Sequence, residues 1–249
     1  TEVAKELPEK TTIEVNIDMN EQQSKLYEAV RATMQKNIRE LIAAKGFGRS
    51  QIQILSALLK LRQVCCHPTL LQLDDVKNQN IESAKLDHLL QMVQDMVEEG
   101  RKILIFSQFT SMLQLIENNL KTLNISTVKL TGQTKKRDEV ITAFQTGDIP
   151  VFLISLKSGG VGLNLTAADT VIHYDPWWNP AAEDQASDRA WRIGQKKPVF
   201  VYKLITNQSI EEKILALQKN KANLTQSILS IDHENEVKLS ENDVMSLLD

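Results

Sequence analysis

Short runs of apolar residues alternate with amphipathic segments over residues 83–230, and this pattern predicts an α/β domain. Near-continuous apolar runs bounded by turn residues are typical of parallel strands that are buried on both faces of a sheet. The predicted strands are 102–107, 125–130, 150–156, 169–174 and 198–205. The predicted helices between them are about 109–123, 134–146 and 180–190. We therefore expect a parallel sheet with helices on both faces.

Helical periodicity also occurs before this range and at both of its ends. Before residue 83, the pattern predicts a strand at 12–18, helices at 21–44 and 50–66 and a surface loop at 72–82. The range itself begins with a helix from Ser83 to Gly100, and its last helix begins at Ser209, where Glu212 completes a capping box. The apolar stripe of that helix is formed by Ile210, Ile214, Leu217, Leu224 and Ile228. We therefore predict that the chain has three parts: a lead-in at 1–82, the α/β domain at 83–208, and a terminal helix with an acidic tail at 209–249.

Composition narrows the class of protein. The 249 residues are 42% hydrophobic and 24% charged, which is typical of globular chains. No apolar run reaches the roughly 18 residues that a membrane span needs, so we expect a soluble protein. The adjacent Cys65 and Cys66 do not have metal-ligand spacing, and we expect both to be buried at a helix end in an intracellular protein.

The charge distribution matters more than the net charge. A formal net charge of -3 gives no indication of nucleic-acid binding. However, residues 231–249 hold six acids and one base, a contribution of -5, so the rest of the chain carries +2. Residues 101–140 hold seven bases and three acids. Because a phosphate backbone responds to local charge, we expect duplex DNA to bind weakly and with strong salt dependence.

Ligands of open α/β sheets bind at the carboxyl ends of the strands, so the residues after each strand are the candidate site. The first strand is followed by Ser107–Thr110, where a hydroxyl and free backbone N–H groups suit a phosphate, with plain N-capping by Ser107 as the alternative. The second is followed by Thr131–Arg137, which places three cations in the first turn of a helix. Cations there oppose the helix dipole, which favours either an external anion or a solvated charge run.

The next two strand ends carry glycines and tryptophans. Gly159, Gly160 and Gly162 allow close backbone approach to a ligand, but they form neither a Walker A loop nor a dinucleotide fingerprint. Trp177 and Trp178 lie in a loop bounded by prolines. Adjacent side chains rarely face the same way, so we expect one tryptophan to be exposed or at an interface.

The most specific stretch is Gln185–Gln195. Arg189 and Arg192 are three positions apart, so the pattern places them on one helix face. Two forked, permanently charged donors on one face suit a polyphosphate. Pairing of Asp188 with one of the arginines is the alternative.

Together these segments resemble the second RecA-like lobe of superfamily-two helicases, and specifically the Swi/Snf-type DNA translocases. The matching stretches are LPEKT (7–11), LRQVCCHP (61–68), SAKLD (83–87), KILIFSQFT (102–110), LTGQTKKRDEVITAF (130–144), LISLKSGGVGLNLTAADTVIHYDPWWNP (153–180) and DQASDRAWRIGQ (184–195). The resemblance implies a RecA-like sheet, a helical protrusion built by residues 21–70 and a brace helix at 209–229.

The resemblance also implies a mechanism and a set of residues. In this family two lobes clamp ATP between them, with Mg²⁺ held mainly by the first lobe, and they move along double-stranded DNA. Arg189 and Arg192 correspond to the arginine fingers, Gly162 and Asn164 lie near the ribose of ATP, and Gln185 lies at the lobe interface. The expected DNA-contacting residues are Ser107, Gln108, Gly132, Thr134, Ser155, Lys157, Ser158 and Trp178.

The sequence departs from the family pattern in a few places. Lys157 stands where Arg is common, Trp191 stands where His is usual, and Trp177 is an additional aromatic residue. More importantly, the 249 residues contain no Walker A sequence and no DExH-like acidic box. We therefore expect this chain to be half of an ATPase and to be inactive without the first lobe of the same full-length chain.

Other functions are weighed against this one. A strand-separating helicase, a bacterial relative that recycles RNA polymerase, a noncatalytic module that binds DNA or a partner, and a Rossmann-type enzyme are the alternatives. The stretch DRAWRIGQ and the Trp178 loop argue against strand separation, and retained arginines argue against a scaffold. DNA-bound protein cargo is a further expected partner, and the expected location is the bacterial or archaeal cytoplasm or the eukaryotic nucleus.

Overall fold

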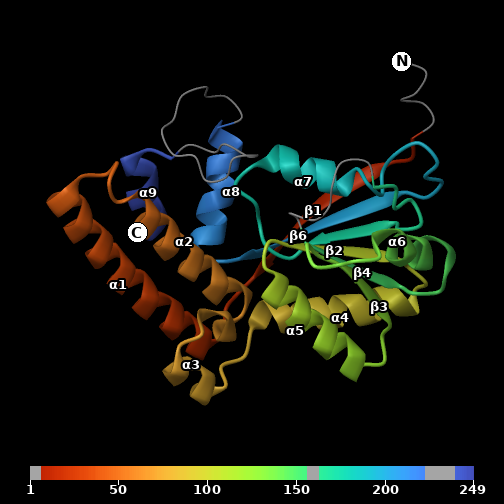
Figure 1. Ribbon diagram of the computed structural model, residues 1–249, viewed down its shortest axis with the longest axis horizontal. Helices are drawn as coiled ribbons and strands as arrows, with labels where there is room; N and C mark the ends of the chain where they lie inside the picture. The colour runs from red at the N-terminus through yellow and green to blue at the C-terminus, as the bar shows by residue number, and fades with distance from the viewer. Residues whose placement is uncertain (1–6, 156–162, 222–238) are drawn as a thin grey trace. The chain divides into compact units, whose positions relative to one another are not determined.

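The computed structural model describes residues 7–155, 163–221 and 239–249, and it divides into two compact units (Figure 1). Unit 1 comprises Thr1–Asn16, Leu86–Asp175 and Ala181–Ile205. Unit 2 comprises Ile17–Lys85, Pro176–Pro180 and Thr206–Asp249. The three-part division into 1–82, 83–208 and 209–249 stays a prediction.

Unit 1 is built on a six-stranded sheet with the order β1-β6-β5-β2-β4-β3. Its strands are β1 (Lys10–Ile17), β2 (Ile103–Ser107), β3 (Thr127–Leu130), β4 (Val151–Ser155), β5 (Thr170–His173) and β6 (Val199–Thr206). β2 pairs in parallel with β4 and β5, β3 with β4, and β5 with β6. Every residue of β2, β4 and β5 is buried, which explains why these runs are continuously apolar. The predicted parallel sheet is confirmed.

Helices cover both faces of this sheet. They are α4 (Ala84–Glu98), α5 (Thr110–Thr122), α6 (Arg137–Thr146) and α7 (Pro180–Ser187). Figure 1 shows α4 and α5 on one side of the sheet and α7 on the other. On the α7 side, Leu104 and Phe106 of β2 share one buried cluster with Phe144 of α6 and Ala186 of α7.

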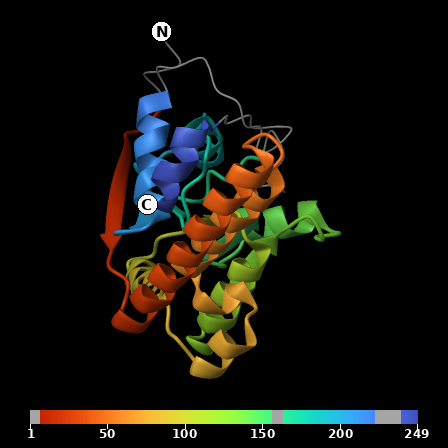
Figure 2. The ribbon, with the colours of Figure 1, turned by 90° about the vertical axis from the view of Figure 1, so that its left-hand side faces the viewer.

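Unit 2 is helical (Figure 2). It contains α1 (Glu21–Lys45), α2 (Gln51–Cys66), a 3-10 helix η2 (Pro68–Leu71), α3 (Asp74–Gln79), α8 (Ile210–Lys221) and α9 (Glu241–Leu248). Its core joins residues of α1, α2, α8 and α9, among them Tyr27, Leu58 and Ile214. Cys65 and Cys66 are free and fully buried at the end of α2, which confirms the prediction.

Buried polar contacts connect the segments of unit 2. The Gln23 side chain donates to the Val64 carbonyl (2.9 Å), and the Ile210 backbone N–H donates to the Tyr27 hydroxyl (2.7 Å). Lys85 forms an ion pair with Glu211, and each of these side chains is only 1% exposed. These contacts fix α8 to the start of α4 and to α1, although the residues are far apart in sequence.

Several predicted boundaries are wrong. The segment 72–82 is not only a loop, because it holds α3, whose Val76 is buried. Helix α9 is absent from the sequence prediction, and Ser240 and Asp243 form a capping box at its start. At α8, Ser209 accepts from the Glu211 backbone N–H (3.1 Å), whereas Glu212 accepts from Gln208 (2.7 Å) rather than from the cap residue.

Two other expectations concern α8 and membranes. Leu224 and Ile228, which belong to the predicted stripe of the last helix, lie outside the described residues. Ile210, Ile214 and Leu217 of the same stripe do pack into the core of unit 2. Among the residues that the structure describes, no helix is long and apolar enough to span a bilayer.

Candidate functional site

The carboxyl ends of β2 and β4 bring two predicted site residues together. Ser107 and Ser155 are register partners, and both side chains are buried. The Ser107 hydroxyl donates to Oδ1 of the buried Asp175 (2.5 Å), and Oδ2 of Asp175 accepts from the Gln108 backbone N–H (3.2 Å). Asp175, which the sequence analysis did not single out, therefore fixes the loop after β2. The DNA contacts of Ser107, Gln108 and Ser155 stay predictions.

The loop after β3 closes on itself. The Thr131 backbone N–H donates to Thr134 Oγ1 (2.9 Å), and the Thr134 N–H donates to the Thr131 carbonyl (3.1 Å). Gly132, between them, is exposed. This turn holds Gly132 and Thr134 at the carboxyl edge of the sheet, where the resemblance places DNA contacts.

The expectation of three cations in the first turn of α6 is wrong. Helix α6 begins at Arg137, so Lys135 and Lys136 precede its first turn, and both are exposed. Asp138 and Glu139 occupy the first turn, where acidic side chains stabilise the helix dipole. The lysines are thus a solvated charged segment beside the helix, and the dipole argument for an external anion is weakened.

The predicted shared helix face of Arg189 and Arg192 is also wrong. Helix α7 ends at Ser187, and both arginines lie in the turns that follow it. Asp188 accepts a hydrogen bond from Lys10 (2.9 Å). Tertiary contacts, rather than helix periodicity, must therefore set the positions of the two guanidinium groups.

Backbone contacts join this arginine segment, residues 188–195, to the segment 163–168. The Leu165 backbone N–H donates to the Arg189 carbonyl (2.9 Å), and Arg192 Nη1 donates to the Leu163 carbonyl (3.0 Å). Gln195 Nε2 donates to the carbonyls of Ala168 and Ala190, both at 2.8 Å. Sequence reasoning missed the role of Gln195, whose only signal was its place at the end of the quoted stretch.

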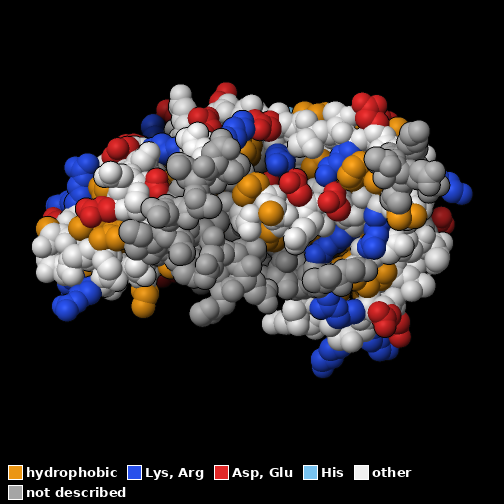
Figure 3. All heavy atoms as spheres, turned by 90° about the horizontal axis from the view of Figure 1, so that it is seen from above, with side chains coloured by type: hydrophobic (Ala, Val, Ile, Leu, Met, Phe, Trp, Pro, Cys, Tyr) orange, Lys and Arg blue, Asp and Glu red, His pale blue; other side chains and the backbone are white. Residues whose placement is uncertain are grey.

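Arg189 is a partly desolvated cation. Its Cζ lies 5.9 Å from the centroid of the Phe106 ring at the end of β2. Burial, and then the positive charge of Arg137, lower the pKa of Arg189 to about 10. A bound phosphate would offset both effects, because an opposite charge stabilises a desolvated cation. Figure 3 shows Lys and Arg side chains interspersed with Asp and Glu over one face of the molecule.

The structure describes only some of the other residues that are predicted to lie near the nucleotide. Asn164 is exposed, and its Oδ1 accepts from the Thr166 backbone N–H (3.2 Å). Gln185 is exposed on α7. Gly162, Lys157 and Ser158 lie outside the described residues. Among the described residues there is no group of three or more His, Cys, Asp or Glu that could hold a metal ion.

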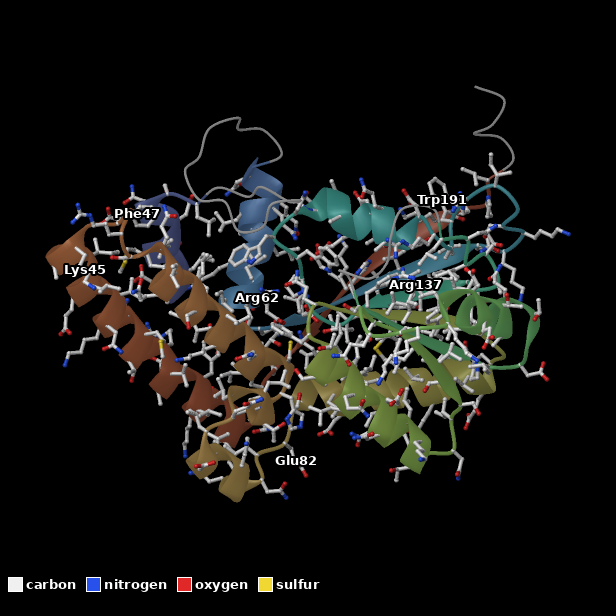
Figure 4. The ribbon with its side chains drawn as sticks, viewed as in Figure 1. Lys45, Phe47, Arg62, Glu82, Arg137 and Trp191 are labelled. Atoms are coloured by element: carbon white, nitrogen blue, oxygen red, sulfur yellow. The ribbon has the colours of Figure 1, made fainter. Side chains whose placement is uncertain are left out.

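The tryptophan pair belongs to unit 2. Trp177 is buried, and its carbonyl accepts a hydrogen bond from Gln218. Trp178 is half-buried against the core of unit 2, and its ring centroid lies 5.7 Å from Cζ of Arg62, which Figure 4 labels on α2. One tryptophan was expected to be exposed or at an interface, and Trp178 does keep part of its surface accessible.

Comparisons with protein families agree with the fold. The family described as the Helicase conserved C-terminal domain matches residues 84–194, and the SNF2-related domain matches residues 1–70. An ATP-dependent helicase of Mycoplasma genitalium, itself uncharacterized, is 37% identical over 96% of this chain. The human SWI/SNF-related matrix-associated actin-dependent regulator of chromatin subfamily A member 1 is 32% identical over 100% of it. The chain spans 23% and 25% of these two relatives.

Solved structures show the same fold. The C-terminal part of the Fun30 ATPase domain superposes with a TM-score of 0.74 and 26% identity, covering 97% of both chains. The Sulfolobus solfataricus SWI2/SNF2 ATPase C-terminal domain has a TM-score of 0.70 and 31% identity, covering 96% of this chain and 94% of the other. The ATPase core of that organism in complex with double-stranded DNA has a TM-score of 0.71 and 36% identity, covering 86% of this chain and 44% of the other. The chain therefore belongs to the Swi2/Snf2 family and has the fold of its RecA-like C-terminal domain.

Proposed function

We propose that this chain is the second motor lobe of an ATP-dependent double-stranded DNA translocase. The observation that carries the proposal is the arginine segment, in which the Arg189 carbonyl and the Arg192 side chain are each bonded to residues 163–168 and Arg189 is half-buried. The family membership supports ATP use. The related Sulfolobus core bound to double-stranded DNA supports the choice of nucleic acid.

In this proposal the two arginines act on the phosphates of ATP. Arg189 is desolvated and lies near a second cation, so it would stabilise negative charge that develops on a transferring phosphoryl group. Arg192 has five N–H donors, and the bond to Leu163 uses Nη1, which orients the fork while the other nitrogen atoms can donate to phosphate. Gly162, Asn164 and Gln185 are proposed to contact the nucleotide or the facing lobe.

The proposal assigns the rest of the catalytic machinery to a first lobe in the same full-length chain. No Walker A sequence occurs in the 249 residues, so the phosphate loop must come from elsewhere. The described residues also offer no acidic cluster suited to Mg²⁺, and we assign no Mg²⁺ ligand to this chain. ATP hydrolysis is therefore proposed to require both lobes.

DNA is proposed to bind along the carboxyl edge of the sheet. Ser107, Gln108, Gly132, Thr134 and Ser155 lie at the ends of β2, β3 and β4, and Lys157 and Ser158 are proposed to extend this contact. Trp178, in unit 2, is proposed as a separate DNA contact. DNA-bound protein cargo and a cytoplasmic or nuclear location belong to the same proposal. A noncatalytic DNA-binding or partner-binding module is the second candidate, because most of these contacts would serve either role.

Two assays test the proposal on this chain. Phosphate release from ATP should stay at the buffer rate with and without duplex DNA, and DNA-stimulated turnover would contradict the half-site assignment. Duplex DNA should bind weakly, with an affinity that falls steeply as salt rises, because phosphate contacts release counterions. Binding that does not change with salt would argue against a phosphate-tracking surface.

A further inference from the structure

The residue between the two arginines contacts the start of the described chain. Trp191 donates from Nε1 to the Pro8 carbonyl at 2.7 Å. The Lys10 ammonium lies 5.1 Å from the centroid of the Trp191 ring and 2.9 Å from Asp188 Oδ1. Figure 4 shows Trp191 beside the start of β1. All of these residues belong to unit 1.

A further backbone bond extends this contact. The Val199 backbone N–H, at the start of β6, donates to the Glu9 carbonyl (2.9 Å). Residues 8–10 therefore lie against both the arginine segment and the strand that follows it. The arginine segment has the 163–168 segment as a second neighbour, through the Arg189 carbonyl and the Arg192 side chain.

The arginine segment needs such contacts because α7 supports only its first residues. Helix α7 ends at Ser187, and residues 188–191 continue from it only in turns, in which the Trp191 backbone N–H donates to the Ser187 carbonyl (3.4 Å). A catalytic side chain must be held close to its productive position, and a displacement of about 1 Å can cost roughly a hundredfold in rate. Fixing Trp191 and Asp188 on both sides of Arg189 restricts that displacement.

We infer that Trp191, together with Lys10 and the Pro8 carbonyl, is a positioning residue for Arg189 and Arg192. This inference rests on the proposed function of the arginines and names what holds them in place. Trp191 touches neither ATP nor DNA in this account. It acts through the backbone of the segment, and its hydrogen bond to Pro8 is the contact that matters most, since both groups are partly shielded from water.

The strength of each contact follows from its exposure. The Lys10 side chain is 19% exposed and that of Asp188 is 48% exposed, so this ion pair is partly screened by solvent. The indole N–H bond is shorter and directional, and loss of one such bond leaves a carbonyl without its protein donor. We therefore expect Trp191 variants to have larger effects than Lys10 variants.

The experiment uses the longer protein that carries this chain with its first lobe. Trp191→Phe keeps an aromatic ring but removes the N–H donor, and kcat of DNA-stimulated ATP hydrolysis should fall about fivefold to tenfold with little change in the KM for ATP. Trp191→His restores a ring N–H and should recover kcat to within about twofold of wild type. Lys10→Gln should lower kcat about twofold, whereas Lys25→Gln, which breaks an ion pair with side chains 76% and 82% exposed, should not change it.

The outcomes separate this inference from the proposed function. If Arg189→Ala abolishes turnover but Trp191→Phe has wild-type kcat, the positioning role is wrong and the proposed function stands. If Phe and His variants lose kcat equally, the hydrogen bond is not the cause and the inference is also wrong. If Arg189→Ala itself keeps wild-type turnover, the proposed function fails instead.

A spectroscopic measurement on this chain excludes a merely structural effect. The indole N–H resonance that Trp191→Phe removes should exchange slowly with solvent in wild type, and Lys10→Gln should shift it. The thermal midpoint of Trp191→Phe should stay within a few degrees of wild type. Rapid exchange of that resonance, or a large drop in the midpoint, would overturn the inference.

Discussion

The backbone N–H of Leu165 donates a hydrogen bond to the carbonyl of Arg189 at 2.9 Å. This bond joins the segment 163–168 to the turn that carries the proposed arginine fingers. Because the turn begins where α7 ends, its geometry depends on such long-range bonds.

Gln195 should be the strongest single support of the arginine segment. Its Nε2 lies within 2.8–3.1 Å of the carbonyls of Ala168, Ala190 and Thr166, and its Oε1 accepts from two backbone N–H groups. Gln195→Ala should lower the free energy of unfolding by about 2–4 kcal/mol, since several buried groups lose their partners. It should also speed tryptic cleavage after Arg189 and Arg192.

Gln114→Ala is the matched control, because the Gln114 side chain is exposed and its hydrogen bonds, to two residues of α5 and to Lys129 of β3, are also exposed to solvent. Urea unfolding of both variants, with limited trypsin digestion, gives the comparison. Equal stability of the two variants would show that Gln195 does not hold the segment.

The Lys85–Glu211 ion pair should be essential to the stability of unit 2. Lys85→Met leaves the Glu211 carboxylate buried without its cation, and this should cost about 3–5 kcal/mol of unfolding free energy. The double variant, with Met at both positions, should recover much of that loss because no isolated charge remains buried. Lys25→Met, in the exposed pair with Glu21, should change stability by less than about 0.5 kcal/mol. A Lys85→Met chain that unfolds at the wild-type urea concentration would refute this.

His173 should make unit 1 sensitive to acid. Burial, and then the charge of Lys203, lower the pKa of His173 to about 3, and its ring stacks on Phe106 and bonds the Ser187 hydroxyl. Between pH 6.5 and about 3 the unfolded state therefore binds a proton that the folded state does not. The contribution of His173 to the free energy of unfolding is fully present above pH 6.5, and it falls by up to about 1.4 kcal/mol for each pH unit below that value.

The pH prediction is tested by comparing the free energy of unfolding of wild type with that of a His173 variant. We expect His173→Gln to lose less stability than wild type between pH 7.5 and pH 5.5, by about 1 kcal/mol. His88→Gln, which changes an exposed histidine on α4, should follow the wild-type curve. Parallel curves for wild type and His173→Gln would mean that the buried ring does not contribute to acid sensitivity.

Lys135 and Lys136 should contribute to DNA affinity through charge alone. Both are exposed next to the Thr131–Thr134 turn. Changing both to Gln should weaken duplex binding and reduce the slope of log affinity against log salt by about one for each phosphate contact that is lost. A variant with Gln at Lys25 and Lys45 of α1 has the same net charge and should bind as wild type does. An unchanged salt slope in the Lys135 and Lys136 variant would place DNA elsewhere.

Much of the fold could be predicted from the sequence because its central strands are buried on both faces. The runs at β2, β4 and β5 are apolar along their length and are too short to be helices, so they are predicted as buried strands. The long helices α1 and α2 were also found within one or two residues of their ends.

The errors have identifiable physical causes. The predicted helix 180–190 runs past Ser187 because periodicity alone does not reveal the hydrogen bonds that Leu165 and Gln195 donate to the carbonyls of Arg189 and Ala190. Helix α9 is not predicted although its signal is present: Ser240 and Asp243 have capping-box spacing before apolar residues, but the acidic composition indicates a tail. The partners of Trp191 could not be found from sequence, since Pro8 lies 183 positions away.

The central claim is that Arg189 and Arg192 serve ATP hydrolysis rather than passive binding, and ATPase activity with DNA binding tests it most directly. In the longer protein with its first lobe, changing both arginines to Ala should lower DNA-stimulated ATP hydrolysis by roughly 10³-fold or more, while duplex affinity stays within about threefold of wild type. Arg39→Ala, on the exposed part of α1, controls for the loss of a cation. A double variant that hydrolyses ATP at the wild-type rate would contradict the account and favour a noncatalytic binding module.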